Sequence, residues 1–145
     1  MLRSCRFRAT LGVALSLFTL IALSTAAQGR SVRVSPAAGE LQRAVALSLE
    51  GDTLHLAPGL YCESPTATDL GPTMLVLDRP LVILGEGSGE GEDEAVLHGG
   101  LALRLLLVEP EAAGTVIHNV TLRGGLAWSG GAIFQRSALL ELVDC

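Results

Sequence analysis

The sequence predicts an all-β protein whose short strands stack as a solenoid behind one N-terminal helix. One segment near the N-terminus has amphipathic helical spacing, and the chain after residue 52 consists of short apolar runs separated by Gly, Pro or acidic breaks. Strands that follow one another without intervening helices indicate an all-β domain. Similar segments also recur at spacings of 22 to 25 residues, within the range of solenoid repeats.

The composition is typical of a single domain and excludes one class of partner. The 145 residues include 10 Arg, no Lys and 15 acidic residues, so the net charge is −5. A hydrophobic fraction of 49% argues against disorder, and a chain of about 150 residues usually forms one domain. No nucleic-acid partner is expected, because nucleic-acid binding needs clustered Lys or Arg.

Residues 1–27 have the plan of a secretory signal peptide. Three Arg within the first eight residues precede an uncharged stretch from Ala9 to Leu23, and small residues follow. This order predicts cleavage after Ala26 or Ala27. An uncleaved anchor helix is the alternative, but the stretch is shorter than the roughly 20 residues of a membrane span. We therefore expect residues 28–145 to be secreted or displayed at the cell surface, with no membrane span beyond the signal peptide.

The helix is expected between Ser35 and Gly51. Ser35 and Pro36 suit a helix start, because Ser caps free N–H groups and Pro fits the first turn. Gly51 is typical of a helix stop. Between them, small and apolar residues fall at three- and four-residue spacing on one face, namely Leu41, Ala44, Val45, Ser48 and Leu49.

The strands are expected to be short and numerous. Residues 53–57 alternate in the manner of a strand, and Pro58-Gly59 turns the chain. Apolar runs then follow at residues 74–77, 81–84, 95–97, 103–108, 116–122, 132–134 and 139–143.

Two internal matches indicate the period. Residues 97–100 match residues 122–125 at an offset of 25, and residues 116–121 lie over residues 138–143 at an offset of 22. An antiparallel sandwich also spaces short strands regularly. Its hairpins favour Asn-Gly or Asp-Gly turns, and the sequence contains neither. The pattern therefore favours the solenoid.

Residues 39–63 resemble the opening of secreted right-handed parallel β-helix proteins of the pectin-lyase-like superfamily. In that family a short helix caps the first coil, and a G-D-T…P-G-x-Y-x-E segment forms the first strand and turn. The matching positions here are Gly51, Asp52, Thr53, Pro58, Gly59, Tyr61 and Glu63. Residues 129–134, S-G-G-A-I-F, resemble the G-G-A-I element of polymorphic outer-membrane protein repeats. The resemblance covers about residues 32–145. It implies a right-handed parallel β-helix of about four coils with an N-terminal capping helix.

Several expectations follow from this architecture. Leu41, Val45 and Leu49 should lie on the open end of the first coil. Cys62 and Cys145 should be about four coils apart, too far for a disulfide. The last coil ends in apolar L-L-E-L-V-D-C with no cap. An open apolar end of a solenoid is unstable, so residues 28–145 are expected to be the N-terminal part of a longer, truncated β-helix domain.

The resemblance implies two alternative functions. One is an exported structural or binding module, adhesin-like, which contacts carbohydrate or other cell-surface components. The other is the N-terminal part of a polysaccharide lyase or glycoside hydrolase whose catalytic coils lie beyond residue 145. Lyases of the superfamily use acidic calcium ligands and an Arg that abstracts a proton beside a uronate carboxylate. Asp78, Arg79 and Arg123 are the candidates here, and without an acidic ladder around them no catalytic residue is assigned.

The densest acidic segment is the loop that follows residue 85. Calcium prefers several oxygen ligands on a flexible loop, so Ca²⁺ bound by Glu90, Glu92, Asp93 and Glu94, with Glu86 nearby, is one interpretation. The other is a solvated loop between coils, because the acidic residues alternate with Gly. No other cofactor is expected.

The three His and one Asn have simpler interpretations. His55, His98 and His118 lack the spacing of metal ligands, and His55, between two Leu, is expected to point outward from its strand. Asn119 begins the sequon N-V-T within a predicted strand. A place at a bend between coils is the alternative for this residue.

Overall fold

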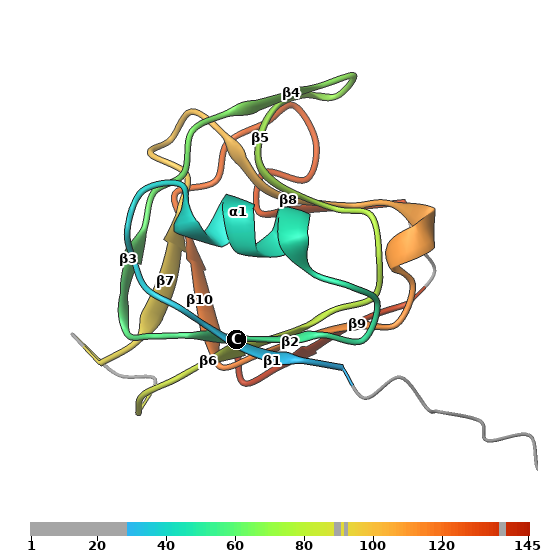
Figure 1. The fold of residues 1–145 in the computed structure, drawn as a ribbon. Coiled ribbons are helices and arrows are strands. Elements are labelled where there is room, and N and C mark those ends of the chain that lie inside the picture. The colour runs from blue at the N-terminus through green and yellow to red at the C-terminus, as the bar shows by residue number, and fades with distance from the viewer. Residues whose placement is uncertain (1–28, 89–90, 92, 137–138) are drawn as a thin grey trace, which may run out of the picture.

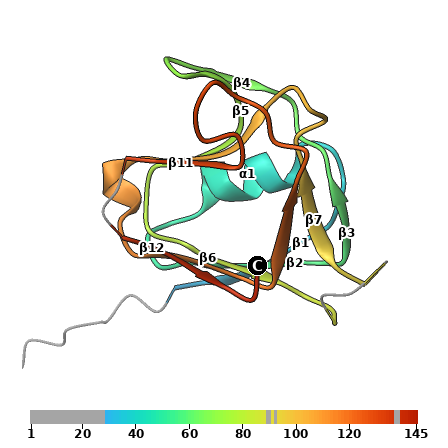
Figure 2. The ribbon, with the colours of Figure 1, turned by 180° about the vertical axis from the view of Figure 1, so that it is seen from behind.

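The computed structural model describes residues 29–88, 91, 93–136 and 139–145, so the predicted signal peptide lies outside the described residues. The described chain is mostly β with one α-helix, which confirms the predicted all-β class. Its strands form three sheets around a shared apolar core (Figures 1 and 2).

The largest sheet has five strands, and every neighbouring pair in it is parallel. In spatial order these strands are β1 (Ser31–Val34), β2 (Thr53–Leu56), β6 (Val82–Gly85), β9 (Thr115–His118) and β12 (Leu140–Val143). Alternate residues face the core: Leu54 and Leu56 are fully buried, whereas the side chain of His55 is 30% exposed. The prediction that His55 points outward is therefore confirmed.

Two smaller sheets complete the fold. The three-stranded sheet contains β3 (Gly59–Tyr61), β7 (Ala95–His98) and β10 (Val120–Arg123), all parallel. The four-stranded sheet contains β4 (Thr66–Thr68), β5 (Gly71–Leu77), β8 (Arg104–Val108) and β11 (Ile133–Gln135). Only the hairpin of β4 with β5 is antiparallel among the described pairs. A short 3-10 helix, Pro110–Ala112, lies between β8 and β9.

The chain visits the three sheets in a fixed order. It passes from β2 through β3 and β5, then from β6 through β7 and β8, then from β9 through β10 and β11, and β12 follows. Each strand thus lies beside the equivalent strand of the next pass. Leu97 pairs with Leu122 and His98 with Arg123, which confirms the predicted offset of 25.

The second predicted offset, 22 residues, is wrong. In the five-stranded sheet Val116 pairs with Glu141, again an offset of 25. Side chains alternate between the two faces of a strand, so a shift of three residues would exchange those faces. The observed register places Leu142 beside buried Ile117 and keeps Glu141 on the outer face.

The passes are longer than predicted. Thr53, Val82, Val116 and Glu141 are successive neighbours in the five-stranded sheet, at spacings of 29, 34 and 25 residues. The β4–β5 hairpin lengthens the first pass, and the acidic loop and the 3-10 helix lengthen the second. The described strands therefore complete three passes, where about four were expected from the shorter period.

The single α-helix, α1 (Glu40–Leu47), lies across one end of the three sheets (Figure 1). Leu41 and Val45 are buried in the core, as expected for a helix that covers this end. Leu49 lies beyond the helix and is 63% exposed, so its expected place on the core face is wrong. None of the described helices is long and apolar enough to cross a membrane.

The predicted helix start at Ser35-Pro36 is also wrong. α1 begins at Glu40, and its N-cap is Gly39 in a left-handed conformation, with φ of 79°. β1 continues to Val34, whose buried side chain belongs to the core, so the chain still has to turn before the helix begins. The carboxylate of Glu63, from a distant segment, then fixes the first turn of α1.

Candidate functional site

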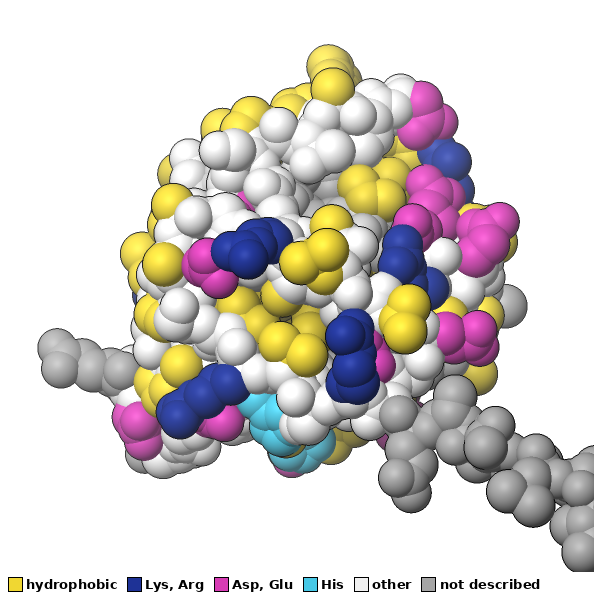
Figure 3. All heavy atoms as spheres, viewed as in Figure 1, with side chains coloured by type: hydrophobic (Ala, Val, Ile, Leu, Met, Phe, Trp, Pro, Cys, Tyr) yellow, Lys and Arg dark blue, Asp and Glu magenta, His cyan; other side chains and the backbone are white. Residues whose placement is uncertain are grey.

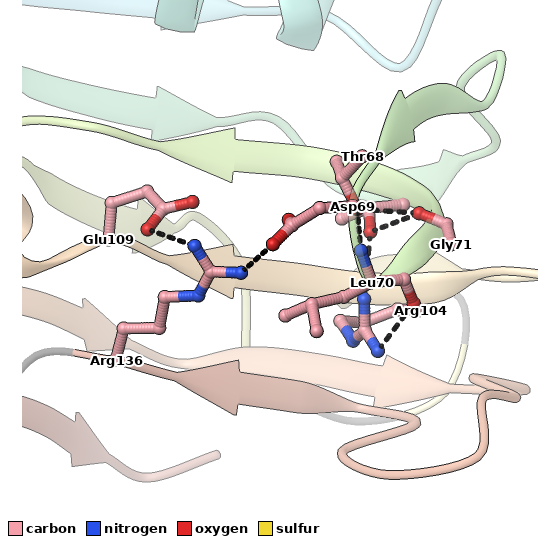
Figure 4. Close-up of polar contacts among 8 residues, drawn as sticks. Thr68, Asp69, Leu70, Gly71, Arg104, Glu109 and Arg136 are labelled. Atoms are coloured by element: carbon pink, nitrogen blue, oxygen red, sulfur yellow. Dashed lines mark hydrogen bonds and ion pairs between the residues drawn. The ribbon is translucent and has the colours of Figure 1, made fainter.

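The guanidinium of Arg104, at the start of β8, is a charged group buried as deeply as the carboxylate of Asp52. Arg104 is 1% exposed. Its Nη2 donates to the carbonyl of Leu70 at 3.1 Å (Figure 4). Its Nη2 also donates to the carbonyl of Ser129 at 3.1 Å, and its Nη1 donates to Thr73 Oγ1 at 3.2 Å. Its Nε donates to the carbonyl of Gly130 at 3.2 Å. One side chain therefore joins the β4–β5 turn, β5 and the loop between β10 and β11.

An aromatic ring completes the surroundings of this guanidinium. The Arg104 Cζ lies 5.2 Å from the ring centroid of Phe134 on β11, within the range of cation–π attraction. A buried positive charge is costly unless hydrogen bonds and opposing charge density compensate it. Here carbonyl dipoles and a ring face provide that compensation, so the donors of Arg104 are directed at the protein itself.

Arg136 forms a second bridge nearby. Its guanidinium contacts the carboxylates of Asp69 and Glu109, the latter at 3.4 Å (Figure 4). Asp69 belongs to the β4–β5 turn and Glu109 directly follows β8, so Arg136 connects three successive passes. The hydrogen bond that Arg136 donates to Asp69 raises the pKa of Arg136 above its usual value. The side chain remains one-third exposed.

Asp52 lies between α1 and β2 and joins the segment before β1 to the segment after α1. Its carboxylate accepts from the backbone N–H of Leu49 at 2.9 Å and from the guanidinium of Arg30 at 2.9 Å. The backbone N–H of Arg30 donates to the second oxygen at 2.7 Å. These hydrogen bonds, that from Leu49 foremost, lower the pKa of Asp52 to about 2. The carboxylate joins β1 to the segment after the helix.

Glu63 fixes the start of α1 from 22 residues further along the chain. Its carboxylate accepts from the backbone N–H of Gly39 at 2.7 Å and from that of Leu41 at 3.2 Å. These are N–H groups that a helix leaves without an intrahelical partner. Tyr61, two residues earlier, is also buried, and burial raises the pKa of its phenol to about 12. Two positions that carry the family resemblance therefore have structural roles.

The candidate calcium ligands have different partners where they are described. Asp93 accepts from the backbone N–H of Ser88 at 3.0 Å, and Glu94 accepts from the hydroxyl of Thr121. Glu90 and Glu92 lie outside the described residues. Across the described part of the chain, no group of three or more His, Cys, Asp or Glu side chains is arranged to hold a metal ion. Calcium binding stays a prediction for this loop.

Glu86, at the start of that loop, turns toward the outer face of the five-stranded sheet. Its carboxylate pairs with Arg33 of β1 at 2.8 Å, and His55 Nδ1 of β2 lies 3.9 Å away. The three side chains come from β1, β2 and the end of β6, which are neighbours in the sheet.

The three lyase candidates lie at two separate places in the fold. Asp78 and Arg79 follow β5 and pair with each other at 2.8 Å, and Arg79 also donates to the carbonyl of Ser48. The hydrogen bond from Arg79 lowers the pKa of Asp78. Arg123 is the exposed last residue of β10, beside a shallow hollow of about 260 Å³ that Leu60 and other residues line. The structure does not bring Arg123 together with the Asp78–Arg79 pair.

The remaining His and the Asn lie at turns or on the sheet surface. His98 Nδ1 accepts from the backbone N–H of Gly100 at 3.1 Å, and His118 Nε2 lies 3.2 Å from Asp144. Asn119 occupies the bend between β9 and β10 with φ of 53°, and its amide donates to the carbonyl of Gly85 in the preceding pass. A Cβ at Gly85 would lie 1.8 Å from the Asn119 carbonyl oxygen, so the bend requires glycine there.

Cys62 and Cys145 are both free and exposed. The sequence analysis did not single out Arg104 or Arg136. A single charge within the apolar run L-A-L-R-L-L-L-V was the signal for Arg104, since a strand buried at every position must also bury the charge it carries. The sequence offers no comparable signal for Arg136, whose acidic partners are 67 and 27 residues away.

Searches with family models, among curated proteins and among solved structures give no significant match to this chain. The functional argument therefore rests on the residues and the geometry described above.

Proposed function

We propose that this chain is a right-handed parallel β-helix capped by α1. The fixed order in which it visits three parallel sheets supports this architecture. Seen from the α1 end, the path from β2 through β3 and β5 to β6 runs clockwise as it recedes (Figures 1 and 2). A path that turns clockwise while it recedes is right-handed. The G-D-T…P-G-x-Y-x-E resemblance of residues 51–63 supports the same assignment.

We infer further that the protein is exported and acts as a structural or binding module. The observation that carries this inference is that the N–H donors of Arg104 are directed at oxygens of three segments of the protein itself. Asp52, Glu63 and Arg136 likewise join segments that are distant in sequence. Side chains with this many internal hydrogen bonds and ion pairs stabilise a rigid scaffold. The leader-like residues 1–27 support export.

The outer face of the five-stranded sheet is the surface best suited to a carbohydrate polymer. Arg33, His55, Leu84, His118 and Val143 form one row across its strands, because each pairs in register with the next. Parallel strands lie about 4.8 Å apart. The row therefore presents polar and apolar side chains at a regular interval, which suits a ligand that is itself a regular polymer.

The test compares binding with turnover. The purified protein is applied to a polysaccharide array and incubated with polygalacturonate and Ca²⁺, and unsaturated products are followed by ultraviolet absorbance. We expect binding to at least one polysaccharide, weakened by His55→Asp and unchanged by Arg123→Ala on another sheet, and we expect no unsaturated products. Turnover that disappears in the Arg123→Ala variant would contradict the proposal and favour the lyase alternative. Absence of binding across the array would contradict the carbohydrate contact.

A further inference from the structure

The surface between β1 and α1 forms a groove that meets the outer face of the five-stranded sheet at Arg33. The groove has a volume of about 260 Å³. Val32, Ala44 and Leu47 supply apolar surface, and Leu47 is 65% exposed although it is a large hydrophobic side chain. Figure 3 shows dark blue basic side chains around yellow apolar ones on this face of the molecule.

One wall of the groove is a strand with an unpaired edge. β1 is the first strand of its sheet and, among the described residues, pairs only with β2. The carbonyls of Arg30 and Val34 accept from the N–H groups of Thr53 and Ala57, so these two residues direct their backbone groups toward β2. Successive residues of a strand direct their hydrogen-bonding groups to opposite sides. Ser31 and Arg33 therefore direct theirs toward the free edge.

The charges that line the groove are mainly positive. Arg30, Arg33 and Arg43 line it, and Glu40 is the acidic residue among its lining. The Arg30 guanidinium is held by the buried carboxylate of Asp52. Arg33 and Arg43 are 72% and 70% exposed, and their pairs with Glu86 and Glu40 are surface pairs. Exposed ion pairs contribute little to stability, so an incoming carboxylate can exchange for either partner at little cost.

We propose that this groove binds an extended acidic peptide segment of a partner protein, which adds to the sheet as a strand beside β1. The free backbone groups of Ser31 and Arg33 supply the main-chain hydrogen bonds of such an addition. The apolar surface of Ala44 and Leu47 receives one face of the segment. Arg33, on the outer face of the sheet, recognises acidic side chains on the other face, and Arg43, one helical turn before Leu47, adds positive charge beside the apolar surface. Acidic and apolar residues thus alternate in the segment, because strand side chains point alternately to two faces.

This inference does not depend on the proposed carbohydrate contact, which uses the sheet surface. The probe is a labelled synthetic peptide of alternating Val and Glu, and its binding to the purified protein is followed by fluorescence anisotropy. A peptide of alternating Val and Lys is the control ligand. We expect the Val-Glu peptide alone to bind, with affinity that falls as salt rises, because exposed charges are screened.

Three variants locate the site. Two of them should each weaken binding at least tenfold. Arg43→Glu changes an exposed helix position that the core does not use, and Ser31→Pro removes an edge N–H without changing charge. Arg123→Glu, a charge reversal on another sheet, should leave binding unchanged. Failure of the Val-Glu peptide to bind, equal binding of the Val-Lys peptide, or an equal loss in Arg123→Glu would each overturn the proposal. Sedimentation that shows a dimer dissociated by Ser31→Pro would overturn it in favour of a second copy as the occupant.

Discussion

At the scale of single residues, polar side chains inside this molecule connect segments that are far apart in sequence. Asp52, Glu63 and Arg104 are all at least 90% buried, and each forms hydrogen bonds to backbone groups of other segments. A buried polar group left without a partner costs about 1–3 kcal/mol. Substitution at these positions should therefore affect folding more than substitution of exposed charges does.

Asp52 should make stability depend on pH. Its pKa is about 2 in the folded protein, against 3.8 for an ordinary Asp. A carboxyl whose folded pKa is depressed stabilises the fold fully above its unfolded pKa, and this contribution is lost as pH falls through the folded value. We therefore expect Asp52→Asn to lower the melting temperature at pH 7 by about 5 °C. The difference from the wild type should shrink as pH falls from about 4 to 2.

Thermal unfolding followed by circular dichroism between pH 2 and 7 measures this effect. Glu50→Gln, at an exposed position near Asp52, is the control because it should leave the pH profile unchanged. A melting temperature of Asp52→Asn that equals the wild-type value at pH 7 would contradict the assigned hydrogen bonds.

Arg104 should be the most costly Arg to replace. Arg104→Met keeps much of the side-chain volume but leaves the oxygens of Thr73, Leu70, Ser129 and Gly130 without their donor. We expect a loss of roughly 3 kcal/mol in the free energy of unfolding, in the range seen when one partner of a buried charged network is removed. Denaturant titration measures it. The exposed control Arg123→Met should change stability by about 0.5 kcal/mol or less, and equal effects of the two variants would refute the structural role of Arg104.

At the scale of elements, two Leu residues of α1 allow a test of which face of this helix covers the core. Leu41 is fully buried and Leu47 is 65% exposed on the same helix. Leu41→Ala should lower the free energy of unfolding by about 2–5 kcal/mol, because a buried Leu leaves a cavity. Leu47→Ala should change it by about 0.5 kcal/mol or less. Denaturant titration of the two variants compares them directly, and similar losses in both would mean that α1 does not lie across the core as described.

Some of the elements could be predicted from the sequence alone, and others could not. The strand at residues 53–57, the outward His55 and the 25-residue match of residues 97–100 with 122–125 follow from local alternation and local similarity, and the structure confirms all three. The helix start was predicted wrongly because the carboxylate that accepts from its first N–H groups, that of Glu63, comes from a distant segment. The period was predicted too short because insertions such as the β4–β5 hairpin lengthen individual passes without disturbing the strands.

The candidate site was less predictable than the fold. Arg104 and Arg136 acquire their roles only when passes 25 or more residues apart lie side by side. The local signal for Arg104, a charge within an apolar run, predicts burial but not its partners, and Arg136 has no comparable signal. The groove beside β1 was missed for a different reason, since the strand Ser31–Val34 that forms one of its walls was not predicted.

At the scale of the whole molecule, stability comes from three mostly parallel sheets that bury apolar residues against one another. Core residues of all three sheets form one apolar cluster, which α1 joins through Leu41 and Val45. Parallel strands buried on both faces, such as β8, explain why so many apolar runs lack the polar alternation of an antiparallel sheet. The proposed row on the five-stranded sheet depends on this arrangement, because its residues come from successive passes, whereas the groove is lined by residues between 30 and 48 in β1, α1 and their flanks.

The most direct measurement of that arrangement is the pattern of nuclear Overhauser contacts between backbone protons of β2, β6 and β9. The account predicts that these contacts join Leu54 with Ile83 and Ile83 with Ile117, and that moving one residue forward on one strand moves one residue forward on its neighbour. Contacts that move forward on one strand while they move backward on the next would show antiparallel neighbours. That result would contradict the parallel stack and, with it, the proposed carbohydrate contact on the five-stranded sheet.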